Sequence, residues 1–148
     1  MAQIRRAEAH WQGDLFAGSG TVSTATTGVL RDQPVTWRAR AEASDTGQTS
    51  PEELLAAAHA TCFAMAFSNG LAKAGTPAQQ LDVTVDVTAD KRDAGFTVLS
   101  SAITVRGKVA GIDQAAFEAA AIGAKDGCPI SRALTGNVEL SVVATLDA

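Results

Sequence analysis

The sequence predicts an α+β fold in which antiparallel sheets wrap around a long central helix. Residues 50–74 are rich in helix-forming residues and are bounded by a start and a stop signal. Residues 81–88 alternate strictly between apolar and polar side chains, which is typical of a half-buried strand. Further strand patterns lie on both sides of the helix, so the expected order is βββ-α-ββ-α-β, without an internal repeat.

The limits of the central helix follow from its flanking residues. Ser50 is a favourable N-cap, Pro51 suits the first helical position, and Glu53 completes a capping box. Gly75 supplies a left-handed cap after the last turn. Apolar residues occur around most of the helix circumference, which predicts a helix covered by other elements: Leu54, Leu55, Ala58, Cys62, Phe63, Met65, Phe67 and Leu71.

The N-terminal part reads as a three-stranded meander. We expect strands over residues 4–11, 21–26 and 35–42, followed by a turn-rich loop over residues 43–49. In the third strand Arg38 and Arg40 would point to the same polar face.

The C-terminal half reads as a hairpin, a helix and a closing strand. The strand over residues 96–109 would pair antiparallel with residues 81–88 and has an irregularity at Ser100-Ser101. Asp113 caps a helix that reaches Lys125. A short helical turn, residues 128–134, and a strand from Val138 to Leu146 complete the chain.

Length and charge limit the class of protein. We expect residues 1–148 to form one domain with a core of its own. The net charge of −4 and the pI near 5.0 argue against a nucleic-acid or membrane partner. The chain does not open with a signal segment, so a cytoplasmic location is expected.

Two cysteines in 148 residues are either inert core residues or a redox pair. A thiol in the middle of a buried helix, such as Cys62, is more often a packing residue than a nucleophile. Cys128 stands at a helix N-terminus, where unpaired N–H groups lower the pKa of a thiol. Local electrostatics therefore favours Cys128 as the more acidic thiol.

His59 lies three residues before Cys62 on the same helical face, where it would pack, share a metal with the thiol or activate it. A zinc site would need His10 or Cys128 as further ligands, and a cysteine hydrolase would need an oxyanion hole that a mid-helix thiol lacks. A packed His59 is the simplest reading.

Several motifs of the chain resemble those of a known protein family. The stretch TSPEELLAAAHATCF, residues 49–63, resembles the first signature of the OsmC/Ohr peroxidases, osmotically inducible protein C and organic hydroperoxide resistance protein. The segments GCPIS, 127–131, and NVEL, 137–140, resemble the second signature and the closing strand of that family. The similarity continues through AHW, 9–11, GVL, 28–30, and DAGF, 93–96.

The resemblance implies a thiol-dependent peroxidase of oxidative and osmotic stress defence, without haem, flavin or metal. Cys62 would attack the peroxide, Cys128 would resolve the sulfenic acid as a disulfide, Arg40 would activate the thiolate, and Glu52 would hold Arg40. The Ohr branch carries its arginine after Asp14, where this chain has none before Arg31, so the OsmC branch is indicated. An external dithiol such as a lipoyl group would be the reductant.

The individual residues and the family resemblance together leave two questions open. Local electrostatics favours attack by Cys128, and the resemblance assigns attack to Cys62. Arg38 is the alternate to Arg40 as the activating cation. The apolar residues Phe63, Met65 and Phe67 favour organic hydroperoxides over hydrogen peroxide as substrates.

The spacing of Glu52 and Cys62 predicts a dimer. Ten helical residues separate two backbones by about 15 Å along the axis and about 80° around it, too far for one site in one chain. The expectation is a two-fold, intertwined homodimer in which each site takes residues from both chains. The rival functions are an apolar ligand-binding module of the hotdog kind and a cysteine hydrolase.

Overall fold

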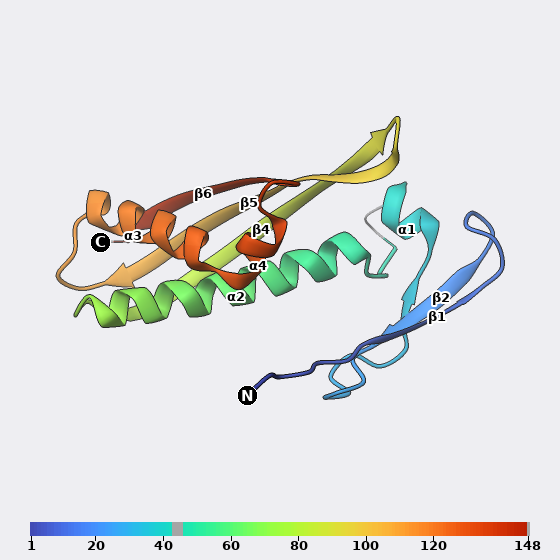
Figure 1. Cartoon of the computed structure of the whole chain (residues 1–148), viewed down its shortest axis with the longest axis horizontal. Coiled ribbons are helices and arrows are strands. Elements are labelled where there is room, and N and C mark those ends of the chain that lie inside the picture. The colour runs from blue at the N-terminus through green and yellow to red at the C-terminus, as the bar shows by residue number, and fades with distance from the viewer. Residues whose placement is uncertain (43–45, 148) are drawn as a thin grey trace. The chain divides into compact units, whose positions relative to one another are not determined.

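The computed structural model describes residues 1–42 and 46–147, which form two compact units, Met1–Leu54 and Leu55–Ala148. Runs of strands and runs of helices follow one another along the chain and form two small sheets and a long helix, so the predicted α+β fold class is confirmed (Figure 1). One domain over residues 1–148 stays a prediction. Residues 43–45 of the expected loop lie outside the described residues.

The first unit holds a three-stranded antiparallel sheet of β1 (Glu8–Gln12), β2 (Ser19–Ser23) and β3 (Gln33–Val35), in that order. His10 of β1 pairs with Thr21 of β2, and Gly20 of β2 pairs with Val35 of β3. The predicted meander is therefore present, although all three strands are shorter than expected.

The prediction of a strand over residues 35–42 is wrong beyond Val35. The chain instead forms a short helix, α1 (Trp37–Ala41), because the Thr36 side chain accepts a hydrogen bond from the Ala39 N–H, 3.2 Å away, and caps it. Residues two apart in a helix point about 200° apart. Arg38 and Arg40 therefore do not share a face, contrary to the strand prediction.

The central helix, α2 (Pro51–Lys73), has the predicted limits and runs without a break. The Ser50 hydroxyl accepts a hydrogen bond from the Glu53 N–H at 3.1 Å, and Gly75 has the left-handed φ of +83° that ends the helix. The Glu53 carboxylate accepts a hydrogen bond from the Thr49 hydroxyl at 2.6 Å rather than from the Ser50 backbone. The N-cap is therefore as predicted, and the reciprocal half of the capping box is replaced by Thr49.

Only one stripe of α2 is buried. His59, Phe63, Phe67 and Leu71, spaced four residues apart, face the core, whereas the Met65 side chain is 68% exposed. The prediction of a helix covered on all sides is therefore wrong for this chain by itself. In length and composition α2 also meets the requirements of a membrane span, as do the core helices of many soluble proteins.

The second unit contains a sheet in the order β4-β5-β6. The strands β4 (Ala78–Arg92) and β5 (Gly95–Val109) form the predicted antiparallel hairpin, and β6 (Glu139–Leu146) runs parallel to β5. The expectation of antiparallel sheets is therefore wrong at β6. Two helices, α3 (Gln114–Gly127) and α4 (Pro129–Leu134), return the chain to the level of Ser100 in the first half of β5, as a parallel connection requires.

The irregularity in β5 lies within a residue of its predicted place. Thr88 pairs with Ser100 and the next residue, Ala89, pairs with Val98, so Leu99 is an extra residue in the ladder. Such a bulge resets which side chains face the core. From Ser101 onward the odd-numbered residues of β5 are buried.

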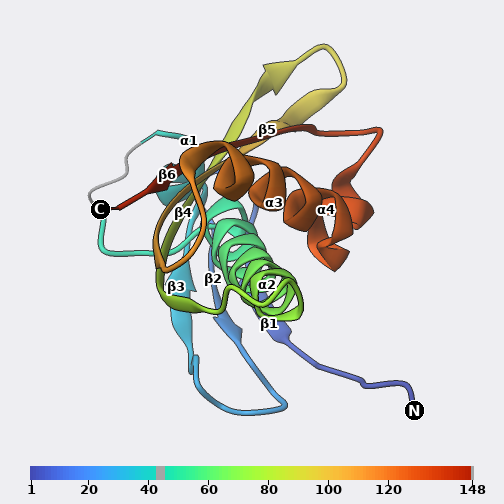
Figure 2. The same ribbon diagram turned by 90° about the vertical axis from the view of Figure 1, so that its left-hand side faces the viewer.

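The core of the second unit lies between this face of the sheet and the helices α2 and α3, which run side by side (Figure 2). The ring of Phe67 lies 5.5 Å from that of Phe63 and 5.0 Å from that of Phe117 in α3. Val85, Ile103 and other sheet residues pack beneath them. The opposite face, with Asp82, Thr84, Asp86, Thr104 and Arg106, is exposed.

Gly107 in β5 provides a test of this packing. A Cβ at Gly107 would lie 2.6 Å from Cζ of the buried Phe117 and 2.9 Å from Cδ2 of Leu81. We expect Gly107→Ala to lower the free energy of unfolding by about 1–3 kcal/mol, because the added methyl overpacks the core.

Gly123→Ala is the matched control, since Gly123 is an exposed α3 residue with no neighbouring atom in the way. It is expected to raise stability by roughly 0.5–1 kcal/mol. Urea unfolding measures both, and equal effects would contradict the packing described.

Candidate functional site

The two cysteines contact each other in the second unit. Cys62 lies in the middle of α2 and is partly buried, and Cys128 is the fully buried N-cap of α4. Both are free thiols, and their side chains interact directly. The N-terminus of α4 thus brings a residue 66 positions away in sequence against the central helix.

The electrostatic surroundings of the two thiols differ. Burial raises the pKa of Cys62, the Ile130 N–H lowers it by less, and the interaction with Cys128 raises it again. Burial also opposes ionisation of Cys128, but the Ser131 N–H, the Cys62 thiol, the Ser131 hydroxyl and the Ile130 N–H together bring its pKa below the ordinary value. The surroundings within this unit therefore favour ionisation of Cys128 over Cys62, in the direction that local electrostatics predicts.

His59 is fully buried and has a hydroxyl partner on each ring nitrogen. Nδ1 lies 2.7 Å from Ser101 Oγ in β5, and Nε2 lies 2.7 Å from Ser131 Oγ in α4. Burial lowers the pKa of His59, so the ring is neutral at pH 7. The packed reading of His59 is therefore correct. Within residues 1–42 and 46–147, no group of three His, Cys, Asp or Glu side chains is arranged to hold a metal.

Arg40 and Glu52 form a close pair in the first unit. Arg40 Nε lies 3.1 and 3.2 Å from the two carboxylate oxygens of Glu52, and a terminal guanidinium nitrogen lies 2.8 Å from Oε1. The Glu52 side chain is 11% exposed and that of Arg40 is 32% exposed. Glu52 thus fixes the orientation of the guanidinium.

An apolar hollow adjoins this pair. It has a volume of about 550 Å³, and among the residues that the structure describes Arg40 is the one charged residue that lines it. The other lining residues are largely apolar side chains of the first unit: Ala9, Trp11, Leu15, Val22, Val35, Thr36, Trp37, Pro51 and Leu54. Arg38 is exposed and lines a different, polar hollow with Phe16 and Gln48. The arrangement therefore favours Arg40 over Arg38 as the cation of an apolar site.

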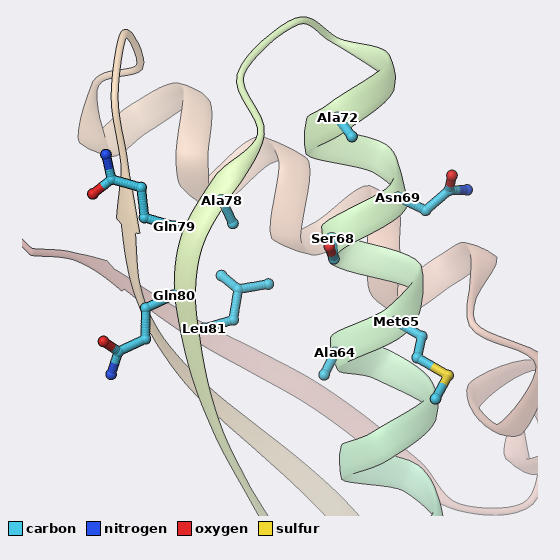
Figure 3. Close-up of a pocket in the computed structure, with 9 residues that line it drawn as sticks. All are labelled: Ala64, Met65, Ser68, Asn69, Ala72, Ala78, Gln79, Gln80 and Leu81. Atoms are coloured by element: carbon cyan, nitrogen blue, oxygen red, sulfur yellow. The ribbon is translucent and has the colours of Figure 1, made fainter.

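A second hollow of about 550 Å³ lies between α2 and β4 (Figure 3). Small and amide side chains line it: Ala64, Met65, Ser68, Asn69 and Ala72 from α2, with Ala78, Gln79, Gln80 and Leu81 from β4. It contains no thiol, imidazole or charged group. This hollow therefore lacks groups for acid, base or redox chemistry.

The structure thus groups the predicted residues into two pairs, Cys62 with Cys128 and Arg40 with Glu52, one pair in each unit. Sequence reasoning missed Ser101 and Ser131 as neighbours of this chemistry. For Ser131 a sequence signal existed, because it lies in the first helical turn after Cys128 and is therefore close to that thiol. The partner of Ser101 lies 42 residues away, beyond the reach of local patterns.

Comparison with known proteins finds a family match that spans both cysteine segments. The family described as OsmC-like protein matches residues 43–143. The chain is 43% identical over 136 residues to Peroxiredoxin OsmC of Escherichia coli (strain K12), covering 92% of this chain and 93% of that one. The protein of the same name from Shigella flexneri matches equally well.

Solved structures share the fold. The organic hydroperoxide resistance protein OhrB of Bacillus subtilis superposes with a TM-score of 0.68 at 26% identity, over 96% of this chain and 98% of that one. An organic hydroperoxide resistance protein OsmC from Legionella pneumophila gives a TM-score of 0.71 at 24% identity, covering 98% of each chain. The fold, both cysteine segments and the identity over nearly the whole chain agree, and the protein belongs to the OsmC family.

Proposed function

We propose that this protein is a cysteine peroxidase that reduces organic hydroperoxides, and hydrogen peroxide more weakly. The observation that carries the proposal is the direct contact of Cys62 with Cys128, because it lets a sulfenic acid on one thiol be resolved by the other. The relatives named for hydroperoxide resistance and as peroxiredoxin support it.

The reaction proceeds in two steps on the protein. The Cys62 thiolate attacks one peroxide oxygen, the O–O bond breaks, and the leaving alkoxide takes a proton to become an alcohol. Cys128 then attacks the sulfenic sulfur of Cys62, forming the S–S bond and releasing hydroxide, which is protonated to water. An external dithiol such as a lipoyl group returns the disulfide to two thiols.

Arg40 is the group that makes Cys62 the attacking thiol. Within its own unit the pKa of Cys62 is raised, so the residue needs a cation to form a thiolate at neutral pH. A guanidinium held by Glu52 stabilises that charge and donates hydrogen bonds to the peroxide oxygens. The apolar hollow beside Arg40 would take the alkyl group of an organic hydroperoxide.

The two pairs meet in a homodimer. Because α2 is continuous, Glu52 and Cys62 lie about 15 Å apart along its axis in one chain. We therefore assign the Arg40–Glu52 pair of each site to one subunit and the cysteine pair to the other. The exposed α2 face with Met65, next to the hollow of Figure 3, gives a second subunit an uncharged surface to cover. We place the dimer in the cytoplasm.

The rival functions have less support. A cysteine hydrolase would require an oxyanion hole of paired N–H donors at Cys62, but the N–H groups in the middle of α2 are engaged within the helix and the surroundings described above for Cys62 include one N–H, that of Ile130. A purely apolar binding module would not need two thiols in contact. Neither rival accounts for both cysteines.

Intact mass spectrometry tests the function. After one equivalent of an organic hydroperoxide under non-reducing conditions, we expect the subunit mass to fall by two hydrogens, since one intramolecular disulfide forms. A dithiol should restore the original mass. Retention of both thiols, or gain of oxygen without a disulfide, would contradict the mechanism.

A further inference from the structure

His59 takes no part in the reaction proposed above, yet its contacts are specific. Its ring is completely buried and bridges the hydroxyls of Ser101 and Ser131, each 2.7 Å away, so it joins α2 to both β5 and α4. Burying an imidazole and two hydroxyls costs free energy that an apolar side chain would avoid. This arrangement needs an explanation beyond packing.

The direction of the hydrogen bonds points to Cys128. Ser131 is the third residue of α4, so it lies on the same helical face as the N-cap Cys128, and its hydroxyl lowers the pKa of the Cys128 thiol. A neutral imidazole donates from one nitrogen and accepts at the other. Only when Nε2–H donates to Ser131 Oγ is the Ser131 O–H free to donate to the sulfur. Ser101 then donates to Nδ1, and the chain of donors runs from Ser101 through His59 and Ser131 to Cys128.

We propose that His59 is a positioning residue that turns the Ser131 hydroxyl onto Cys128 and so holds Cys128 as the thiolate that resolves the Cys62 sulfenic acid. This rests on the proposed peroxidase function. In the step concerned, the Cys128 sulfur attacks the Cys62 sulfur, the S–S bond forms, the S–O bond breaks, and hydroxide leaves with the electron pair and takes a proton from the buffered solvent to become water. The sulfur of Cys128 is oxidised and that of Cys62 is reduced.

The groups that face Cys128 come from two helices. From α2 these are the titratable Cys62 and, behind Ser131, the neutral His59; from α4 they are the N–H groups of Ile130 and Ser131 and the Ser131 hydroxyl. The backbone N–H groups stay in place when side chains are changed. The Ser131 hydroxyl is therefore the adjustable contribution, and His59 sets its direction.

Ser131→Ala removes the hydroxyl and tests the inference through pH. A rise of about one unit in the pKa of Cys128 would lower its thiolate fraction about tenfold at low pH. The thiolate that does form would be about threefold more reactive, because the Brønsted coefficient for thiolate attack is about 0.4–0.5. At pH values below the Cys128 pKa of both proteins, we expect disulfide formation in Ser131→Ala to be about threefold slower than in the unsubstituted protein. At pH values above both pKa values, the variant should be about threefold faster, so the two pH profiles cross.

The measurement is rapid quenching with a thiol-blocking reagent after one equivalent of hydroperoxide, read by mass at a series of pH values. Ser131→Thr keeps the hydroxyl and should retain the original profile. Ser101→Ala removes the first donor of the chain but leaves Ser131 in place, so it should shift the profile in the same direction as Ser131→Ala and by less. His59→Phe should behave like Ser131→Ala.

The outcomes separate the two claims. Crossing profiles in Ser131→Ala, with a near-original profile in Ser131→Thr and a smaller shift in Ser101→Ala, support the inference. Unchanged profiles, or equal slowing at all pH values, would overturn it while sulfenic acid formation on Cys62 still proceeded. If the unsubstituted protein formed neither sulfenic acid nor disulfide, the peroxidase proposal itself would fail.

Discussion

Cys62→Ser is expected to reduce hydroperoxide consumption to the uncatalysed rate, because a serine hydroxyl does not ionise at neutral pH and does not attack the O–O bond. Cys128→Ser is expected to consume one equivalent per subunit and then stop with a sulfenic acid on Cys62. The two thiols contact each other, so the pair of variants assigns the order of attack. Stopped-flow peroxide consumption and chemical trapping of the sulfenic acid measure the two results.

The reverse outcome is a real alternative, since Cys128 has the lowered pKa within its unit. If Cys128→Ser lost the first turnover and Cys62→Ser kept it, then Cys128 would be the attacking thiol. A double variant that still consumed hydroperoxide would show that neither thiol is responsible. Circular dichroism before the assay confirms that each variant is folded.

Arg40→Ala is expected to slow attack by Cys62 by about 10²–10³-fold, the usual cost of removing one preorganised donor from a developing charge. Arg38→Ala is the matched control, because Arg38 is the same residue type on the same short helix α1, but lines a polar hollow instead. It should leave the rate within about twofold, since exposed charges contribute little. A larger loss in Arg38→Ala than in Arg40→Ala would reverse the assignment.

Mixing inactive subunits tests where Arg40 acts. When Cys62→Ser subunits exchange with Arg40→Ala subunits, half of the dimers are mixed and one of their two sites is intact if each site is shared between subunits. Activity should then recover to about one quarter of the unsubstituted level. No recovery after proven exchange, or a monomer by sedimentation, would contradict the shared site.

The sequence alone determined those features that depend on neighbouring residues. The limits of α2 followed from Ser50 and Gly75, and the β4–β5 hairpin followed from alternation, because caps and strand periodicity are local properties. The pairing of Cys62 with Cys128 came from the family resemblance of the two motifs. It was not visible in their spacing.

Only the tertiary structure decided the rest, because long-range contacts outweigh local preference. Residues 37–41 alternate as a strand would, but they form a helix that separates Arg38 from Arg40; its Thr36 cap is a local signal that the strand prediction overlooked. The direction of β6 depends on where α3 and α4 return the chain. The hydroxyl partners of His59 lie 42 and 72 residues away, so no local pattern places them beside an imidazole or its neighbour Cys128.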